Sequence, residues 1–132
     1  MGKKKNGEMI LNRKYLEMLK LLNIYLNHFP RHEKYALANR IRNTAYEVYD
    51  LIIEIQKRHL KKTTVTNLDI AHEKLRMQIY LASELGYFNF KDGKKSDDYN
   101  IAKRYMTIES MIDEIGRLLG GWFNKLKVEG KI

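Results

Sequence analysis

Apolar residues recur at alternating spacings of three and four along most of the chain, and this spacing predicts helices. In a helix with 3.6 residues per turn, it places the apolar side chains on one face, which packs against other helices. The pattern predicts helices over residues 8–28, about 34–62, about 68–85 and from near residue 100 onward. No segment alternates as a half-buried strand does. The sequence therefore predicts an all-α fold, an up-down four-helix bundle.

Each predicted helix has its own seam of apolar residues, and the four seams are the predicted core. The first seam consists of Leu11, Tyr15, Met18, Leu22, Tyr25 and Phe29, widened by Leu19 and Leu26. The second consists of Leu37, Ile41, Ala45, Val48, Ile52 and Ile55. The third consists of Leu68, Ala71, Leu75, Ile79, Ala82 and Leu85. The fourth consists of Ile101, Tyr105, Ile108, Ile112, Ile115, Leu119, Trp122 and Leu126.

The first predicted helix carries more apolar residues than one seam needs. Leu16, Leu21 and Ile24 lie off the seam and indicate that a second face is covered as well. Such a helix is either central to its own bundle or lies at a contact between subunits.

Proline, glycine and threonine residues mark the predicted helix ends. Pro30, the only proline, disfavours a helical Phe29 and can begin the next helix. Thr63 to Thr66 predict a short connection, with Thr66 or Asn67 as N-cap. Gly86 is placed to end the third helix in a left-handed conformation, and the polar stretch between Tyr87 and Asn100 predicts the one long loop.

The predicted domain organisation is one bundle preceded by a short arm. Residues 1–7 contain three lysines and two glycines. They are interpreted as a flexible basic arm or as extra residues that come from an expression vector. Residues 8–128 form the predicted bundle, a length that can bury a sizeable core.

The net charge of +9 predicts a polyanionic partner. Cationic surfaces attract nucleic acid at long range and release its counterions on binding. Charge alone also leaves open an anionic membrane surface, and a charge that only keeps the protein in solution.

The sequence contains no cysteine, which removes disulfides, thiolate zinc sites and a cysteine nucleophile together. No apolar run approaches the roughly 18 residues that span a bilayer. We therefore expect a soluble, cytoplasmic protein without membrane association.

No arrangement of residues predicts catalysis. The four histidines lack the spacing of a zinc or di-iron motif, and Glu47, Asp50 and Glu54 share a helix face with cations, as solvated acids do. No phosphate-binding loop or serine nucleophile motif is present. We predict no enzyme activity, no catalytic residue, no metal site, no cofactor and no small-molecule substrate.

The basic residues are the candidate binding site for nucleic acid or another partner. They are Arg31, Lys34, Arg40, Arg42, Lys57, Arg58, Lys61, Lys62, Lys74, Arg76 and Arg117. Arg40 and Arg76 border apolar seams, where a charge is costly unless it is paired or functional. For any one of these residues, a solvated helix face is the alternative interpretation.

Tyrosines add a possible stacking surface. Tyr35, Tyr46, Tyr49 and Tyr80 could stack on bases, although tyrosine at the margin of a core is the commoner arrangement.

Three glycines interrupt the fourth predicted helix beside its tryptophan. Because helix glycines cost about 1 kcal/mol each relative to alanine, their presence indicates close approach of another helix. We predict that Gly116, Gly120, Gly121 and Trp122 pack in an oligomer.

Several short motifs together resemble one family. They are Phe29-Pro30-Arg31 before a basic amphipathic helix, Leu75-Arg76 on the third helix, and the segment Ile115-Gly116-Arg117-Leu118-Leu119-Gly120-Gly121-Trp122. In this order and spacing, over about residues 10–127, they resemble the accessory variability determinant (Avd) family of diversity-generating retroelements. This family shares a four-helix-bundle superfamily with the proteins encoded in ribosomal RNA intervening sequences.

The resemblance implies a specific role. Proteins of the Avd family assemble as a ring of five bundles with a basic conical exterior and a central channel. They bind the reverse transcriptase and the template RNA of the retroelement, and they support adenine-mutagenic cDNA synthesis without catalytic activity of their own. The implied partners are thus reverse transcriptase, RNA or also DNA, and further copies of the chain in a homo-pentamer.

The intervening-sequence branch is the alternative, and it implies a structural or protein-interaction module. That branch has Asn-Ile-Ala-Glu-Gly where this chain reads Asp50-Leu51-Ile52-Ile53-Glu54, and Gly-Ser-Leu-x-Glu-Leu where it reads Tyr80-Leu81-Ala82-Ser83-Glu84-Leu85. The Gly120-Gly121-Trp122 ending favours the Avd branch. Tyr80 stands where some Avd-like proteins have a second arginine, which weakens the prediction of a basic groove there.

Overall fold

Over the residues that the structure describes, the protein consists of four long antiparallel helices and one short turn of 3₁₀ helix. The computed structural model describes the backbone of residues 2–59, 61–91 and 97–132, and the side chains of residues 7–59, 61–91 and 103–132. The helices are α1 (Gly2–Asn27), α2 (Leu37–Lys57), α3 (Lys62–Glu84) and α4 (Asp97–Val128), and the 3₁₀ turn is η1 (Arg31–Glu33). No strand occurs in these ranges.

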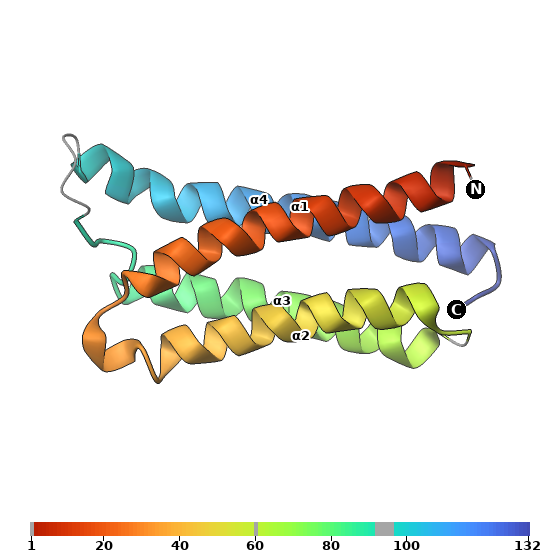
Figure 1. The fold of residues 1–132 in the computed structure, drawn as a ribbon, viewed down its shortest axis with the longest axis horizontal. Helices are drawn as coiled ribbons and strands as arrows, with labels where there is room; N and C mark the ends of the chain where they lie inside the picture. Colours follow the sequence, from red (N-terminus) through yellow and green to blue (C-terminus); the bar gives the residue numbers. More distant parts are fainter. Residues whose placement is uncertain (1, 60, 92–96) are drawn as a thin grey trace.

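The helices form an up-down bundle, as predicted. α1 packs against α2 and α4, and α3 packs against the same two helices from the other side. Figure 1 shows the α1–α2 connection at the same end of the bundle as the end of α3, and the C-terminus at the opposite end beside the end of α2. The extent of the domain, and the flexibility of residues 1–7, stay predictions; the helix itself extends to Gly2 rather than residue 8.

The predicted seams form one continuous core. All predicted seam residues of α2 except the half-buried Leu37 are buried, and so are those of α4 from Ile108 to Leu126. Leu26 lies in the core of α1, while Tyr25 and Leu19 pack at its margin. Leu85 was predicted in the seam of α3 and is half exposed, because the helix ends one residue before it. The predicted seam residue Ile101 lies outside the described side chains.

The second helix is shorter than the predicted range of 34–62. It begins at Leu37, because η1 and a turn follow Pro30, and it ends at Lys57. After Ile55, the next two seam positions are His59 and Lys62, so continuing the helix would bury no further apolar side chain.

The predicted connection Thr63–Thr66 is instead the beginning of α3. Thr64 is buried and extends the seam of Leu68 by one turn. The prediction of Thr66 or Asn67 as N-cap is wrong: the Thr66 hydroxyl donates back to the Lys62 carbonyl at 3.1 Å, inside the helix. The N-cap residue is Lys61, which makes no capping hydrogen bond through its side chain.

The predicted helix end at Gly86 is confirmed. Gly86 has a φ of +78°, the left-handed region that glycine adopts without a steric penalty. Its N–H donates to the Ser83 carbonyl at 3.0 Å, and the Tyr87 N–H donates to the Ala82 carbonyl at 2.9 Å. These bonds satisfy the last carbonyls of α3 and turn the chain back toward α1.

An aromatic cluster with Glu33 at its edge connects the α1–α2 corner to the end of α3. Phe29 is buried, with its ring centroid 5.4 Å from that of Phe88 and 5.6 Å from that of Tyr87. Glu33 accepts a hydrogen bond from the Leu37 N–H at 3.0 Å with one carboxylate oxygen. Its other oxygen accepts from the Tyr87 hydroxyl at 3.1 Å. One side chain therefore caps α2 and attaches it to the segment after α3.

We expect Glu33→Ala to destabilise the fold by about 1–3 kcal/mol, because it removes a helix cap and leaves the Tyr87 hydroxyl without its acceptor. Urea unfolding followed by circular dichroism measures the change. Glu17→Ala is the matched control: it removes the same charge from an exposed position on α1 and should stay within about 0.5 kcal/mol of the unsubstituted protein. Equal stability of both variants would contradict the role of Glu33.

Candidate nucleic-acid interface

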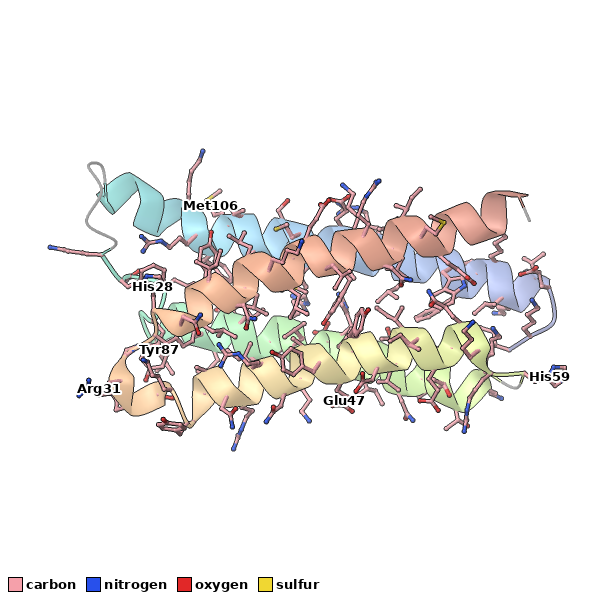
Figure 2. All side chains as sticks on the ribbon, viewed as in Figure 1. His28, Arg31, Glu47, His59, Tyr87 and Met106 are labelled. Atoms are coloured by element: carbon pink, nitrogen blue, oxygen red, sulfur yellow. The ribbon has the colours of Figure 1, made fainter. Side chains whose placement is uncertain are left out.

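Seven of the eleven predicted binding cations are exposed and unengaged. Within the described residues, their side chains form no ion pair and no hydrogen bond to the protein. They are Arg31, Lys34, Arg40, Lys57, Lys62, Lys74 and Arg117. Figure 2 shows Arg31 extending from one end of the bundle, while His59, two residues after Lys57, extends from the other. Free cations therefore lie along α2 and α3 and at both ends of the bundle.

Three further predicted cations are already engaged within the chain. Arg42 donates to the side-chain oxygens of Asn23 at 2.9 Å and Asn27 at 3.0 Å, and so connects α2 to α1. Arg58 pairs with Glu54 at 3.1 Å. These contacts give Arg42 and Arg58 a structural role. The pair with Glu54 also reduces the positive charge that Arg58 offers to a ligand.

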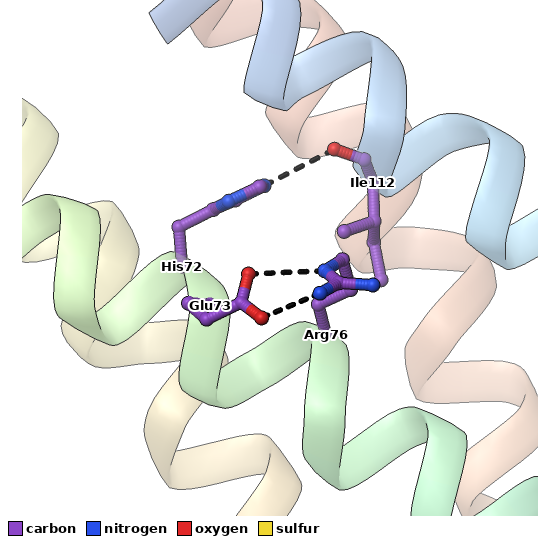
Figure 3. Close-up of polar contacts among 4 residues, drawn as sticks. All are labelled: His72, Glu73, Arg76 and Ile112. Carbon is purple, nitrogen blue, oxygen red and sulfur yellow. Dashed lines mark hydrogen bonds and ion pairs between the residues drawn. The ribbon is translucent and has the colours of Figure 1, made fainter.

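Arg76, the third of them, forms an ion pair with Glu73 one turn earlier on α3. Its guanidinium donates to both carboxylate oxygens, at 3.0 Å and 2.5 Å (Figure 3). The pair lowers the pKa of the Glu73 carboxyl. The charge of Arg76 beside the seam is thus paired inside its own helix, as a charge near apolar surface requires.

Lys61 does not belong to the exposed surface, contrary to its place in the predicted site. The residue is 7% exposed, and its ammonium donates to the Ile55 carbonyl at 2.6 Å. A cation on the last carbonyls of α2 complements the negative end of the helix dipole. Lys61 therefore stabilises the turn between α2 and α3.

A polar groove lies between the first half of α2 and the middle of α3. It has a volume of about 490 Å³ and contains Arg40 from one helix and Lys74 from the other. Asn39 and Asn43 line it one helical turn apart, and Gln78 lies one turn beyond Lys74. Among the described side chains, no acid pairs with either cation, although Glu47 also lines the groove. Two unpaired cations from two helices therefore line one groove and make it positively charged.

Residue spacing in the sequence assigns each of these residues to a helix face. It does not show that the face of α2 and the face of α3 lie side by side. Asn39, Asn43 and Glu47 recur at steps of four, as do Lys74 and Gln78, which places each set on one helix face. Only the structure, which fixes how α2 is rotated about its axis relative to α3, shows that the two faces line one groove. The predicted site therefore included Arg40 and Lys74 and missed the amide side chains between them.

The four tyrosines that could stack on bases differ in their surroundings. Tyr49 is half-buried, with its ring stacked on buried Tyr15 at 6.1 Å, so it belongs to the core margin. Tyr35 is 93% exposed and lies beside the groove that contains Arg40. Tyr46 and Tyr80 are less than half exposed.

The close helix approach predicted from the glycines occurs within the chain at Gly116. A Cβ atom there would lie 3.1 Å from Cε1 of His72 on α3, so α4 approaches α3 closely at this point. Trp122 is 9% exposed and belongs to the core of the same chain. At Gly120 and Gly121 a Cβ atom would meet nothing within 4 Å, so only these two of the four predicted packing residues leave open space for another chain.

His72 fills the space that Gly116 leaves. Its Nε2 lies 3.1 Å from the Ile112 carbonyl of α4 (Figure 3), and because a carbonyl oxygen only accepts, Nε2 carries the proton. Burial lowers the pKa of His72 below its ordinary value of 6.5. The neutral ring therefore joins α3 to α4.

Among the side chains that the structure describes, no three histidine, aspartate or glutamate residues gather as metal ligands would. None of the helices in the described ranges combines the length and apolar character needed to cross a bilayer.

The fold and the surface define a class: an antiparallel four-helix bundle with free cations on two adjacent helices. A family model of bAvd-like proteins matches residues 9–126, and the chain therefore belongs to the bAvd-like family. This match confirms the resemblance to the Avd family carried by the segments around Pro30, Arg76 and Trp122. No curated protein matches the chain closely enough to show a relationship.

We expect the fold to lose stability as the pH falls from 7.5 to 5.5. The unfolded chain takes up a proton at His72 near pH 6.5, while the folded chain keeps this ring neutral to a lower pH, so proton uptake favours unfolding. Urea unfolding at the two pH values measures the loss, which should be smaller in His72→Gln. His59→Gln, at an exposed position, is the control and should keep the full loss. An undiminished loss in His72→Gln would contradict this account.

Proposed function

We propose that this protein is a non-enzymatic accessory protein of a diversity-generating retroelement. In this role it binds the reverse transcriptase and the template RNA, and supports mutagenic reverse transcription. The observation that carries the proposal is the match to the bAvd-like family over residues 9–126. The net charge of +9 and the free cations of α2 and α3 support a nucleic-acid partner.

The RNA-binding surface centres on α2 and α3. Arg40 and Lys74 line the polar groove from α2 and α3, and Lys57 and Lys62 continue the positive surface toward the α2–α3 turn. Arg76 and Arg58 contribute less than their formal charge, because Glu73 and Glu54 pair with them. DNA offers the same phosphates and is a second nucleic-acid partner for this surface.

Apolar residues on the outer side of α3 provide a surface for the protein partner. Ile70 is 60% exposed, and Met77, Leu81 and Leu85 are each about half exposed, at spacings of seven, four and four. This spacing places Ile70, Met77 and Leu81 in one stripe with Lys74. A reverse transcriptase docked there would bury apolar surface beside the cation that meets RNA.

Self-association is part of the proposed function. The open space at Gly120 and Gly121 on α4 allows the backbone of another bundle to approach. Leu16 and Ile24 lie off the seam of α1 and are exposed in the single chain, so another subunit could cover them. We propose that these faces pack between subunits of a homo-pentameric ring of the kind implied for the family.

The salt dependence of RNA binding tests the electrostatic part of the proposal. Each phosphate contact to single-stranded RNA contributes about 0.7 to the slope of log affinity against log salt concentration. We therefore expect Arg40→Ala with Lys74→Ala to reduce the magnitude of this slope by about 1.4. Fluorescence anisotropy with a single-stranded RNA, from 50 to 200 mM salt, measures it.

Arg13→Ala with Lys20→Ala is the matched control for net charge. It removes two exposed cations from α1 and should leave the slope nearly unchanged. Equal reductions in the two double variants would show that only net charge attracts RNA, which would contradict a binding surface on α2 and α3.

A further inference from the structure

Gln78, which lines the polar groove between α2 and α3, has a buried side-chain acceptor without a donor. The side-chain oxygen of Gln78 is inaccessible to solvent, and no described residue donates a hydrogen bond to it. An unsatisfied buried amide oxygen destabilises a fold, so such groups normally have a partner. Because Gln78 lines the groove, a rotation of its side chain would bring this oxygen to an N–H group of a partner that enters there.

The groove also contains a place for an anion. Arg40 from α2 and Lys74 from α3 line the groove, and neither is neutralised by an acid of the described chain. A phosphate held between them would accept hydrogen bonds from both, and these charge-assisted bonds are among the stronger ones in proteins.

Tyr35 adds an aromatic face to the same groove. It precedes α2, lines the groove and is 93% exposed, which is unusual for a large ring. Aromatic side chains that stand free beside a cationic groove are the stacking platforms of proteins that bind single-stranded nucleic acid. Base stacking would cover the apolar ring that the fold leaves in water.

Glu47 limits how a nucleic acid can lie in the groove. Its carboxylate lines the groove two helical turns beyond Arg40, and Figure 2 shows this side chain on the outer side of α2. A carboxylate repels a phosphate, so a chain of phosphates cannot follow the whole groove. A strand that crosses the groove places one phosphate between the cations and one base inside.

We propose that the groove is a binding site for one nucleotide of single-stranded RNA. Arg40 and Lys74 hold the phosphate and Tyr35 stacks on the base. The side chain of Gln78, turned toward the groove, accepts from an amino or imino group of the base edge. Asn39 and Asn43 supply further polar contacts to the nucleotide. The inference rests on the proposed binding of RNA, to which it adds contacts that recognise bases and not only phosphates.

The test compares two polyanions of similar charge, a single-stranded RNA decamer of mixed sequence and inorganic polyphosphate, which has no bases. Tyr35→Ala should weaken RNA binding by about five- to a hundredfold, as alanine does at other base-stacking rings, and should leave polyphosphate binding unchanged. Gln78→Leu should weaken RNA binding by about two- to tenfold, while urea unfolding finds it at least as stable as the unsubstituted protein, because an unsatisfied acceptor is removed.

Tyr46→Ala is the matched control, since Tyr46 is an exposed tyrosine of α2 outside the groove, and it should bind both polyanions normally. If the unsubstituted protein prefers RNA to polyphosphate and both groove variants keep that preference, the nucleotide site is wrong while the proposed RNA binding stands. If the unsubstituted protein shows no preference for RNA, the proposed function fails at its RNA-binding step, and the nucleotide site fails with it.

Discussion

The hydrogen bonds of Glu33 are the constraint on which the geometry of the α2–α3 face depends. By capping the Leu37 N–H, the carboxylate sets where α2 begins, and by accepting from Tyr87 it holds that beginning against the end of α3. Packing of Phe29 on Phe88 supplies the apolar part of the same corner. Tyr35 lies between Glu33 and Leu37, and Arg40 lies in the first turn of α2, so their position relative to Lys74 follows from this corner. The proline turn that separates the first two helices therefore also positions the candidate binding surface.

Much of the fold could be predicted from the sequence, because in a helix bundle the apolar residues at steps of three and four are the ones that become buried. Ile41, Ile52 and Leu75 are buried as the steps of three and four require, and Gly86 ends α3 as a residue without a Cβ atom can. The boundary between α2 and α3 could not be predicted in this way. It depends on the Lys61 ammonium folding back onto the Ile55 carbonyl, a contact between non-adjacent turns that leaves no periodic signal.

The candidate site was predictable as charge and not as geometry. Net charge and helix faces pointed to Arg40 and Lys74, but the sequence gives the same weight to Arg42, whose guanidinium is held by Asn23 and Asn27 of α1. The sequence also did not show whether Gly116 permits a contact within the chain or between subunits. In the structure, the side chain that packs against it is His72 of the same chain. To tell a free basic side chain from one that is bonded within the chain, the rotation of each helix about its axis must be known. Residue spacing does not determine this rotation. The family match adds the biological setting that charge alone leaves open.

The central claim is that this bundle assembles with itself and takes up single-stranded RNA on the cations of α2 and α3. Size-exclusion chromatography with multi-angle light scattering, on the protein alone and mixed with a single-stranded RNA at micromolar concentration, tests it most directly. The account predicts a particle of five chains that elutes together with RNA at low salt and releases it at high salt. A monomer that elutes apart from RNA at every salt concentration would contradict the account.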